Sequence, residues 1–444
     1  MTILIYIAFT IVSISSMFPN NAFMNAHEYF YYKLRNVTND GDPVNATNRY
    51  FIKELFEETP TELQANFEAY LTVYGGLACV IGSIINVFGT KSFSNSARVI
   101  WGHALVVIVF IPTIALTLFD SDSYQQLFFQ VTMILISIAC FGSLGLIAGG
   151  VLGLSSTFPA KYTQAVMVGQ SLAGVLATAI SIVCQAVTPN VILNGQLYFA
   201  FSLIMTIISI GAYLYLNHIA PPQEEIEAER QGLLNDDDDE IVIESQVTNF
   251  PPIDEPTAAI EITFPLQETV WTTISNVFAT SWMDLLTVSM TLLVTLAVYP
   301  GMTSLVRSTT RNPTWNAYFS SVVSFLLYNV IDLIGRSSAN SVRLKSRYLL
   351  ILSLVRIALI PLIAMCNISP RKYTPSLIPY DGIYVMLIII LGASHGFCIT
   401  NATIGVSLSV APEYRELAGS ITALTGVTAA MFGGIVGVLV LKSL

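Results

Sequence analysis

The sequence predicts an all-α polytopic membrane protein with eleven membrane-spanning helices. Of its 444 residues, 54% are apolar and only 11% are charged, and the mean hydropathy is +0.66. Soluble domains carry about twice this share of charge. A helix needs roughly 20 apolar residues to cross about 30 Å of hydrocarbon. Runs of that kind lie near residues 3–22, 69–90, 98–119, 126–155, 163–188, 195–217, 281–302, 315–336, 347–366, 383–409 and 415–441.

The first run, 3–22, has no basic region ahead of it and no small-x-small cleavage site. These features of a secretory signal peptide are missing, so we expect a retained helix.

A long acidic segment separates the sixth run from the seventh. Residues 218–270 hold fourteen Asp/Glu and one Arg, which leaves fifteen acidic and eighteen basic residues elsewhere. A segment so charged and so poor in aromatic residues is expected to be disordered. We therefore predict a six-helix bundle over 1–217, an acidic cytoplasmic loop over 218–270 and a five-helix bundle over 271–444.

Two glycosylation sequons indicate the orientation. Asn36-Val-Thr and Asn45-Ala-Thr lie between the first two runs, and they are acceptors only on the lumenal or extracellular face. The N-terminus is then cytoplasmic. With the N-terminus inside, the short loops place seven basic residues on the cytoplasmic side and five on the outside, which agrees with this orientation. The basic residues of the longer first loop would reverse that bias if they were counted.

Small residues recur every four positions in several runs, as in Gly145, Gly149 and Gly153, or Gly433 and Gly437. This spacing lets membrane helices approach closely. All five cysteines also fall in apolar runs, where we expect them to be small packing residues. The four histidines are scattered without metal-ligand spacing.

One apolar run contains a polar stripe. Asn329, Asp332 and Arg336 are spaced at i, i+3 and i+7, which places them on one face of a helix. Charges inside the bilayer are costly and normally face a water-filled path or a partner. A functional site is one interpretation of this stripe. The alternative is that Arg336 reaches the cytoplasmic interface as an anchor. Asp284, near the start of the seventh run, is expected to be an interfacial charge.

Five segments, in this order along the chain, resemble motifs of the equilibrative nucleoside transporters, the solute carrier family 29 type. They are "PNNAFMNAHEYF", "PAKYTQAVMVGQSLAG", "YNVIDLIGRS", "VRIALIPLIAMCN" and "APEYRELAG". The resemblance implies a facilitative, major-facilitator-like carrier with a 6+5 arrangement. It implies nucleoside as substrate, a lipid bilayer as surroundings, and neither an enzyme activity, a cofactor nor a nucleic-acid partner. The substrate residues it suggests are Asn20, Met24, Gln170, Asn329, Asp332, Arg336 and His395.

Two positions depart from the family pattern. Asn20 stands where the family usually has Trp, and Ala148 where it usually has Gln, so a ring and an amide for the nucleobase are missing. A carrier for nucleobases or organic cations, and a carrier-like receptor that no longer transports, therefore stay open. An intramembrane enzyme using Asp332 would need a second carboxylate or nucleophile at similar depth, and the sequence offers none.

The acidic loop contains a possible sorting address. Glu229 precedes the pair Leu233-Leu234 in a pattern that resembles an endolysosomal signal read by sorting adaptors. The alternative is a plain disordered acidic loop. The plasma membrane is the location we expect, with an endolysosomal membrane as the alternative.

Overall fold

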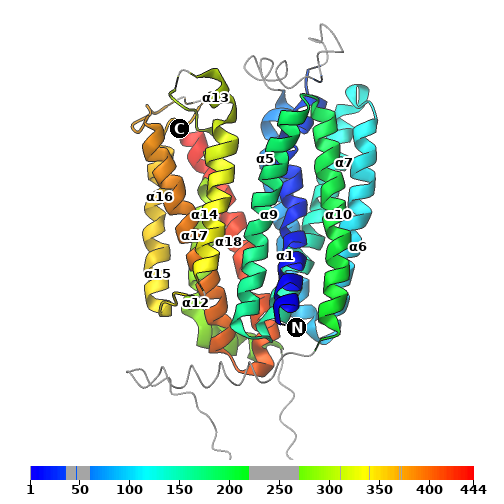
Figure 1. Cartoon of the computed structure of the whole chain (residues 1–444), viewed down its shortest axis with the longest axis vertical. Helices are drawn as coiled ribbons and strands as arrows, with labels where there is room; N and C mark the ends of the chain where they lie inside the picture. Colours follow the sequence, from blue (N-terminus) through cyan, green and yellow to red (C-terminus); the bar gives the residue numbers. More distant parts are fainter. Residues whose placement is uncertain are drawn as a thin grey trace, which may run out of the picture.

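A computed structural model describes residues 2–36, 47, 61–219, 270–310, 312–339, 341–369, 371 and 373–444. Asn45, Glu229, Leu233 and Leu234 lie outside these residues, as does nearly all of the predicted acidic loop. Within the described part, the helices form two groups that stand side by side (Figure 1). The fold is therefore all-α, as the sequence predicts.

The first group comprises the helices that precede the acidic loop. In chain order these are α1 (Thr2–Asn25), α2 (His27–Lys33), α5 (Glu62–Phe88), η2 (Gly89–Lys91), α6 (Asn95–Leu118), η3 (Asp122–Tyr124), α7 (Gln125–Cys140), the π-helix η4 (Phe141–Ile147), α8 (Ala148–Ser156), α9 (Ala160–Val187) and α10 (Val191–Asn217).

The second group comprises the helices that follow the loop. In chain order these are α12 (Val270–Val298), η5 (Thr303–Leu305), α13 (Pro313–Phe319), the π-helix η6 (Ser320–Leu327), α14 (Tyr328–Ser338), α15 (Ser346–Val355), η7 (Arg356–Ala358), α16 (Leu359–Ala364), α17 (Asp381–Ser409), η8 (Pro412–Tyr414) and α18 (Arg415–Ser443).

Ten helical segments among the described residues are long and apolar enough to cross a membrane. Each predicted run overlaps a helical segment of the structure. The run near 315–336 falls in α13, η6 and α14, which are helical but are not among those ten. The polytopic membrane architecture is confirmed, while the count of eleven is not confirmed by this measure.

Local sequence accounts for where several helices begin. Thr61 and Gln64 form a reciprocal capping box at the start of α5. Ser94 caps α6, and Asn190 caps α10, each by accepting from backbone N–H groups of the first turn. Such caps satisfy donors that have no partner within the helix.

Close helix contacts occur at the small residues, as predicted. A Cβ added to Gly145 of η4 would lie 2.9 Å from the Cα of Gly82 in α5. A Cβ added to Gly437 of α18 would lie 2.5 Å from the carbonyl oxygen of Ala297 in α12. Only hydrogen fits at these positions, so a glycine is needed for the backbones to approach. All five cysteines are buried and unpaired.

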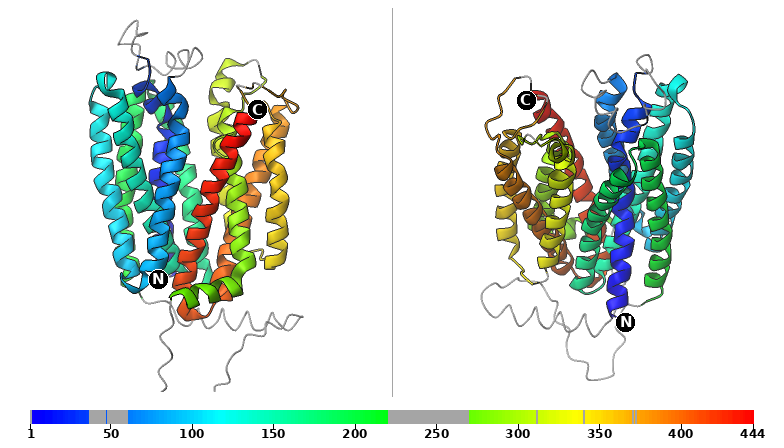
Figure 2. Two further views of the ribbon diagram at one scale, coloured as in Figure 1. Left: turned by 180° about the vertical axis from the view of Figure 1, so that it is seen from behind. Right: turned by 45° about the horizontal axis from the view of Figure 1, so that its top comes forward.

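The two groups touch most firmly near the end of the molecule where α1 begins, here called the lower end because it is at the bottom of Figure 1. Arg98 at the start of α6 forms an ion pair of 2.9 Å with Glu416 at the start of α18. Ser407 of α17 donates to Ser156 of α8 over 3.0 Å. In Figure 2 the two groups lie closer together at this end than at the opposite end.

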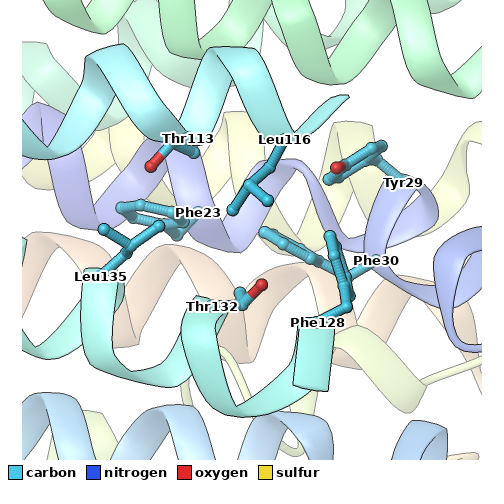
Figure 3. A pocket seen from close by; sticks show the side chains of 8 residues that line it. All are labelled: Phe23, Tyr29, Phe30, Thr113, Leu116, Phe128, Thr132 and Leu135. Atoms are coloured by element: carbon cyan, nitrogen blue, oxygen red, sulfur yellow. The ribbon is translucent and has the colours of Figure 1, made fainter. Parts of the chain in front are cut away.

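A small hollow of about 10 Å³, room for about one water molecule, lies inside the first group (Figure 3). Aromatic and aliphatic side chains of α1, α2, α6 and α7 line most of it, including Phe23, Phe30 and Phe128, and Thr113 and Thr132 add two hydroxyls. None of the predicted substrate residues lines this hollow.

Candidate functional site

The polar stripe of α14 is buried inside the protein. Asp332 is 3% exposed and Arg336 is 5% exposed, and Asn329 is also buried. Helical spacing puts the three side chains on one face, and that face packs against α9 of the first group and α17 of the second. The stripe therefore lies where the two groups meet.

Both carboxylate oxygens of Asp332 are engaged. Arg336 Nε donates to Oδ2 over 2.9 Å, and His395 Nδ1 of α17 lies 2.7 Å from Oδ1. Because an ionised carboxylate only accepts, Nδ1 must carry the proton of the His395 ring. The neutral ring then presents Nε2 as an acceptor. Nε2 is buried and has no hydrogen-bond partner among the described residues.

Arg336 extends from α14 to α9. Its Nη1 donates to the Met167 carbonyl over 3.0 Å and to Gln170 Oε1 over 3.3 Å. No described residue accepts a hydrogen bond from Nη2. A guanidinium carries five N–H donors in a planar fork, so the N–H groups of Nη2 remain for another acceptor.

Asn329 makes another contact between the two groups. Its Nδ2 lies 3.3 Å from Thr178 Oγ1 of α9 and 3.3 Å from the Tyr299 hydroxyl that follows α12. Its carbonyl accepts from Ser171 over 3.3 Å. Gly174 of α9 faces the Asn329 side chain so closely that a Cβ there would collide with it.

Two glycines let α14 and α17 lie against each other. A Cβ on Gly335 would be 2.6 Å from the Ala393 carbonyl oxygen, and a Cβ on Gly396 would be 2.8 Å from the backbone nitrogen of Arg336. This arrangement places His395 beside Asp332.

The structure adds a buried cation that the sequence alone does not single out. Arg356 of η7 donates to Ser394 Oγ over 2.9 Å, to the Thr291 carbonyl over 3.0 Å and to Thr295 Oγ1 over 2.6 Å. These partners are all neutral. The position of Arg356 in the "VRIALIPLIAMCN" motif is the one signal that could have found it.

The remaining predicted residues divide into two sets. Gln170 joins the α14 cluster through Arg336. Asn20 and Met24 contact each other over 3.7 Å in α1, and Asn20 lies 3.8 Å from Cys140 Sγ. Among the described residues, no hydrogen bond joins these two to the α14 cluster.

Asp284, expected to be an interfacial charge near the start of the seventh run, is buried inside the protein. It is 2% exposed. The helical backbone of α12 is interrupted at Ser281, close to the predicted start of the seventh run, so Asp284 lies in the first turn after this kink. Its burial comes from Ser346 at the start of α15 and Gly405 of α17. No group of three His, Cys, Asp or Glu suited to a metal occurs in the described part of the chain.

Comparison with known proteins identifies the family. The family model described as "Nucleoside transporter" matches residues 133–441, which is more than half of the chain. The chain belongs to the nucleoside transporter family.

Individual members of this family are similar over almost the whole length. Equilibrative nucleoside transporter 2 of Homo sapiens is 24% identical, covering 94% of this chain and 92% of the relative. Equilibrative nucleoside transporter 2 of Rattus norvegicus is 26% identical, and equilibrative nucleoside transporter 1 of Homo sapiens is 25% identical, each with the same coverage of both chains.

Solved structures support the fold. The proton:xylose symporter XylE, of the major facilitator superfamily, has a TM-score of 0.60 at 12% identity, covering 97% of this chain and 87% of that one. The fucose:proton symporter FucP of E. coli has a TM-score of 0.52 at 11% identity, covering 100% and 96%. The nucleoside transporter family member described here therefore has a major-facilitator-like architecture.

Proposed function

We propose that this chain carries nucleosides across a membrane by alternating access, without an enzymatic step, and that the α14 cluster binds the sugar. The observation that carries the proposal is the position of Arg336. It is held by Asp332 within the second group and by Met167 and Gln170 of the first. A substrate that binds this side chain can therefore bias how the two groups sit against each other.

The free donors and acceptors suit a sugar with neighbouring hydroxyls. Arg336 Nη2 offers N–H donors, and His395 Nε2 offers an acceptor. A ribose hydroxyl can accept from the first and donate to the second. Asp332 orients both side chains and keeps the His395 proton on Nδ1.

The buried charges argue against the organic-cation alternative. Around this site the second group places Arg336 and Arg356 against the single carboxylate of Asp332. A site with excess positive charge disfavours a cationic substrate. A nucleobase lacks the ribose diol, so Nη2 of Arg336 would have no hydroxyl acceptors from it.

Asn20 and Met24 are assigned a secondary role at the base end of the substrate. Asn20 takes the place of the usual Trp, and its amide contacts Met24 and Cys140 in this conformation. We propose that these side chains approach the substrate only after the groups rearrange.

The domain limits, membrane location and modifications belong to the same proposal. The six-helix unit spans 1–217, the acidic loop 218–270 and the five-helix unit 271–444. The plasma membrane is proposed as the location, and Glu229, Leu233 and Leu234 as a signal for adaptors. If Leu233→Ala with Leu234→Ala leaves the steady-state location unchanged, the signal does not operate.

Uptake by purified protein in proteoliposomes tests the function. Radiolabelled uridine and adenosine should equilibrate across the membrane, and unlabelled nucleosides should compete better than nucleobases or tetraethylammonium. Equal competition by the cation, or no uptake of either nucleoside by correctly folded protein, would contradict the proposal. An Asn20→Trp variant should strengthen nucleoside binding if the usual ring contacts the base.

A further inference from the structure

A second buried carboxylate lies in the second group, away from the α14 cluster. Asp284 of α12 is 2% exposed. Its Oδ2 accepts from Ser346 Oγ at the start of α15 over 2.9 Å, while Oδ1 is buried with no hydrogen-bond partner among the described residues. Asp332, by comparison, has an arginine and a histidine on its two oxygens.

Within the described part of the chain, no cation compensates Asp284. It is the only charged residue of α12. On the elements packed against α12, the charged groups include Lys345 and Arg347 beside Ser346, both exposed, Arg356 of η7, and Arg415 and Glu416 at the start of α18. Arg356 binds Ser394, Thr291 and Thr295. None of these forms an ion pair with Asp284, and Glu416 pairs with Arg98.

The titratable side chains of α17 are also engaged elsewhere or lie toward the far end. His395 binds Asp332. Asp381, at the start of α17, accepts from hydroxyl groups of the segment before α13, and Cys398 lies one turn after His395. The residue of α17 that does touch Asp284 is Gly405.

The space around Asp284 is too small for a metal ion. A Cβ on Gly405 would lie 2.7 Å from Oδ2 and 3.0 Å from Oδ1. Among the described residues, Ser346 is the only other side chain with an oxygen at hydrogen-bond distance. Hard cations need about six oxygen ligands. A proton needs neither the volume nor the ligands.

We propose that Asp284 is a proton-binding site and that it is protonated in the conformation described here. An uncompensated carboxylate in a low-dielectric interior is strongly unfavourable, and a bound proton removes the charge. The proton enters from the aqueous phase at the lower end and returns to it when water reaches the carboxylate.

The position of Asp284 connects this proton to the contact between the groups. α12, α15 and α17 meet at its side chain. α12 also packs along α18, which carries Glu416 and Gly419 against the first group. Protonation therefore stabilises the arrangement in which the lower end is closed. This link to transport rests on the proposed function, whereas proton binding itself does not.

Infrared difference spectroscopy on the purified full-length protein tests proton binding without any substrate. Between about pH 8 and about pH 5, wild type should gain a carboxylic-acid C=O band, or show one already present at about pH 8. Asp284→Asn should lack that band. Asp381→Asn, which removes an engaged carboxylate at the opposite end of α17, should keep it.

A spectrum of Asp284→Asn identical to that of wild type would overturn the proposal. The Asn side chain is isosteric with Asp and keeps an oxygen that can accept from Ser346. The wild-type spectrum is a second test, because the absence of any buried carboxylic-acid band down to about pH 5 would also overturn the proposal.

Uptake in proteoliposomes tests the link to transport. Wild-type uptake should fall by about threefold or more as the pH at the lower end drops from about pH 8 to about pH 5.5, since the closed arrangement is held more tightly. Asp284→Asn should stay near the acid level and change by less than about 1.5-fold. A wild-type pH profile in this variant would overturn the link. No nucleoside uptake at any pH would instead overturn the proposed function, with the infrared band still deciding proton binding.

Discussion

Replacing Arg336 by Lys separates a substrate-binding guanidinium from a structural one. In wild type, Nε holds Asp332, Nη1 holds Met167 and Gln170, and Nη2 is the prong assigned to the sugar. An ammonium keeps the charge but has a single nitrogen, so it cannot hold Asp332 and bind a diol in separate directions. We expect Arg336→Lys to reach the membrane and to transport poorly.

The expected magnitude follows from the hydrogen bond to the sugar that the substitution removes. A hydrogen bond to a charged group contributes about 1.5–3 kcal/mol. Removing one such bond to the substrate, about 2 kcal/mol, lowers kcat/KM for uridine about 30-fold. Wild type should also prefer uridine over 2′,3′-dideoxyuridine by about 30-fold, and Arg336→Lys should reduce that preference to about threefold or less.

The assay is competition by the two nucleosides against labelled uridine uptake, corrected for the amount of folded protein in the membrane. Arg356→Lys is the matched control, because Arg356 is equally buried but binds only groups of its own bundle. It should lower the amount of folded protein without changing the diol preference. Normal uridine affinity and an unchanged diol preference in Arg336→Lys would refute a guanidinium role in sugar binding.

Three further predictions concern the gate, the acceptor and the orientation. Glu416→Gln should weaken the lower-end ion pair with Arg98 by about 1 kcal/mol, because Glu416 is 42% exposed and the pair is partly screened by water. This change should shift the conformational equilibrium about fivefold toward the state in which the lower end is open. Alkylation of a cysteine introduced at Ser407 measures the shift. Unchanged labelling would contradict this. His395→Asn keeps a donor for Asp332 but loses the Nε2 acceptor, so nucleoside affinity should fall about fivefold in competition assays while the amount of folded protein is kept; equal affinity would remove His395 from the site. Asn36→Gln with Asn45→Gln should abolish a glycosidase-sensitive gel shift, and a wild type without such a shift would leave the orientation unsupported.

The membrane setting, the helix positions and the polar face of α14 can be predicted from the amino-acid sequence alone. These depend on local properties: apolar runs of bilayer length, capping residues, and the 3.6-residue period that aligns Asn329, Asp332 and Arg336. The motifs also sufficed to indicate the family. Such features are encoded within a few turns of chain, so they can be read without knowing which helices become neighbours.

The contacts of that face depend on how the helices pack against one another. The spacing on α14 does not say that Met167 and Gln170 come from α9, that His395 comes from α17, or that Asn20 and Met24 lie apart from the cluster. The burial of Asp284 likewise could not be predicted from the sequence of its own helix. Its burial depends on Ser346 and Gly405, which are 62 and 121 positions away along the chain. Contacts between distant segments are set by packing of whole helices, and a residue pattern within one helix cannot specify them.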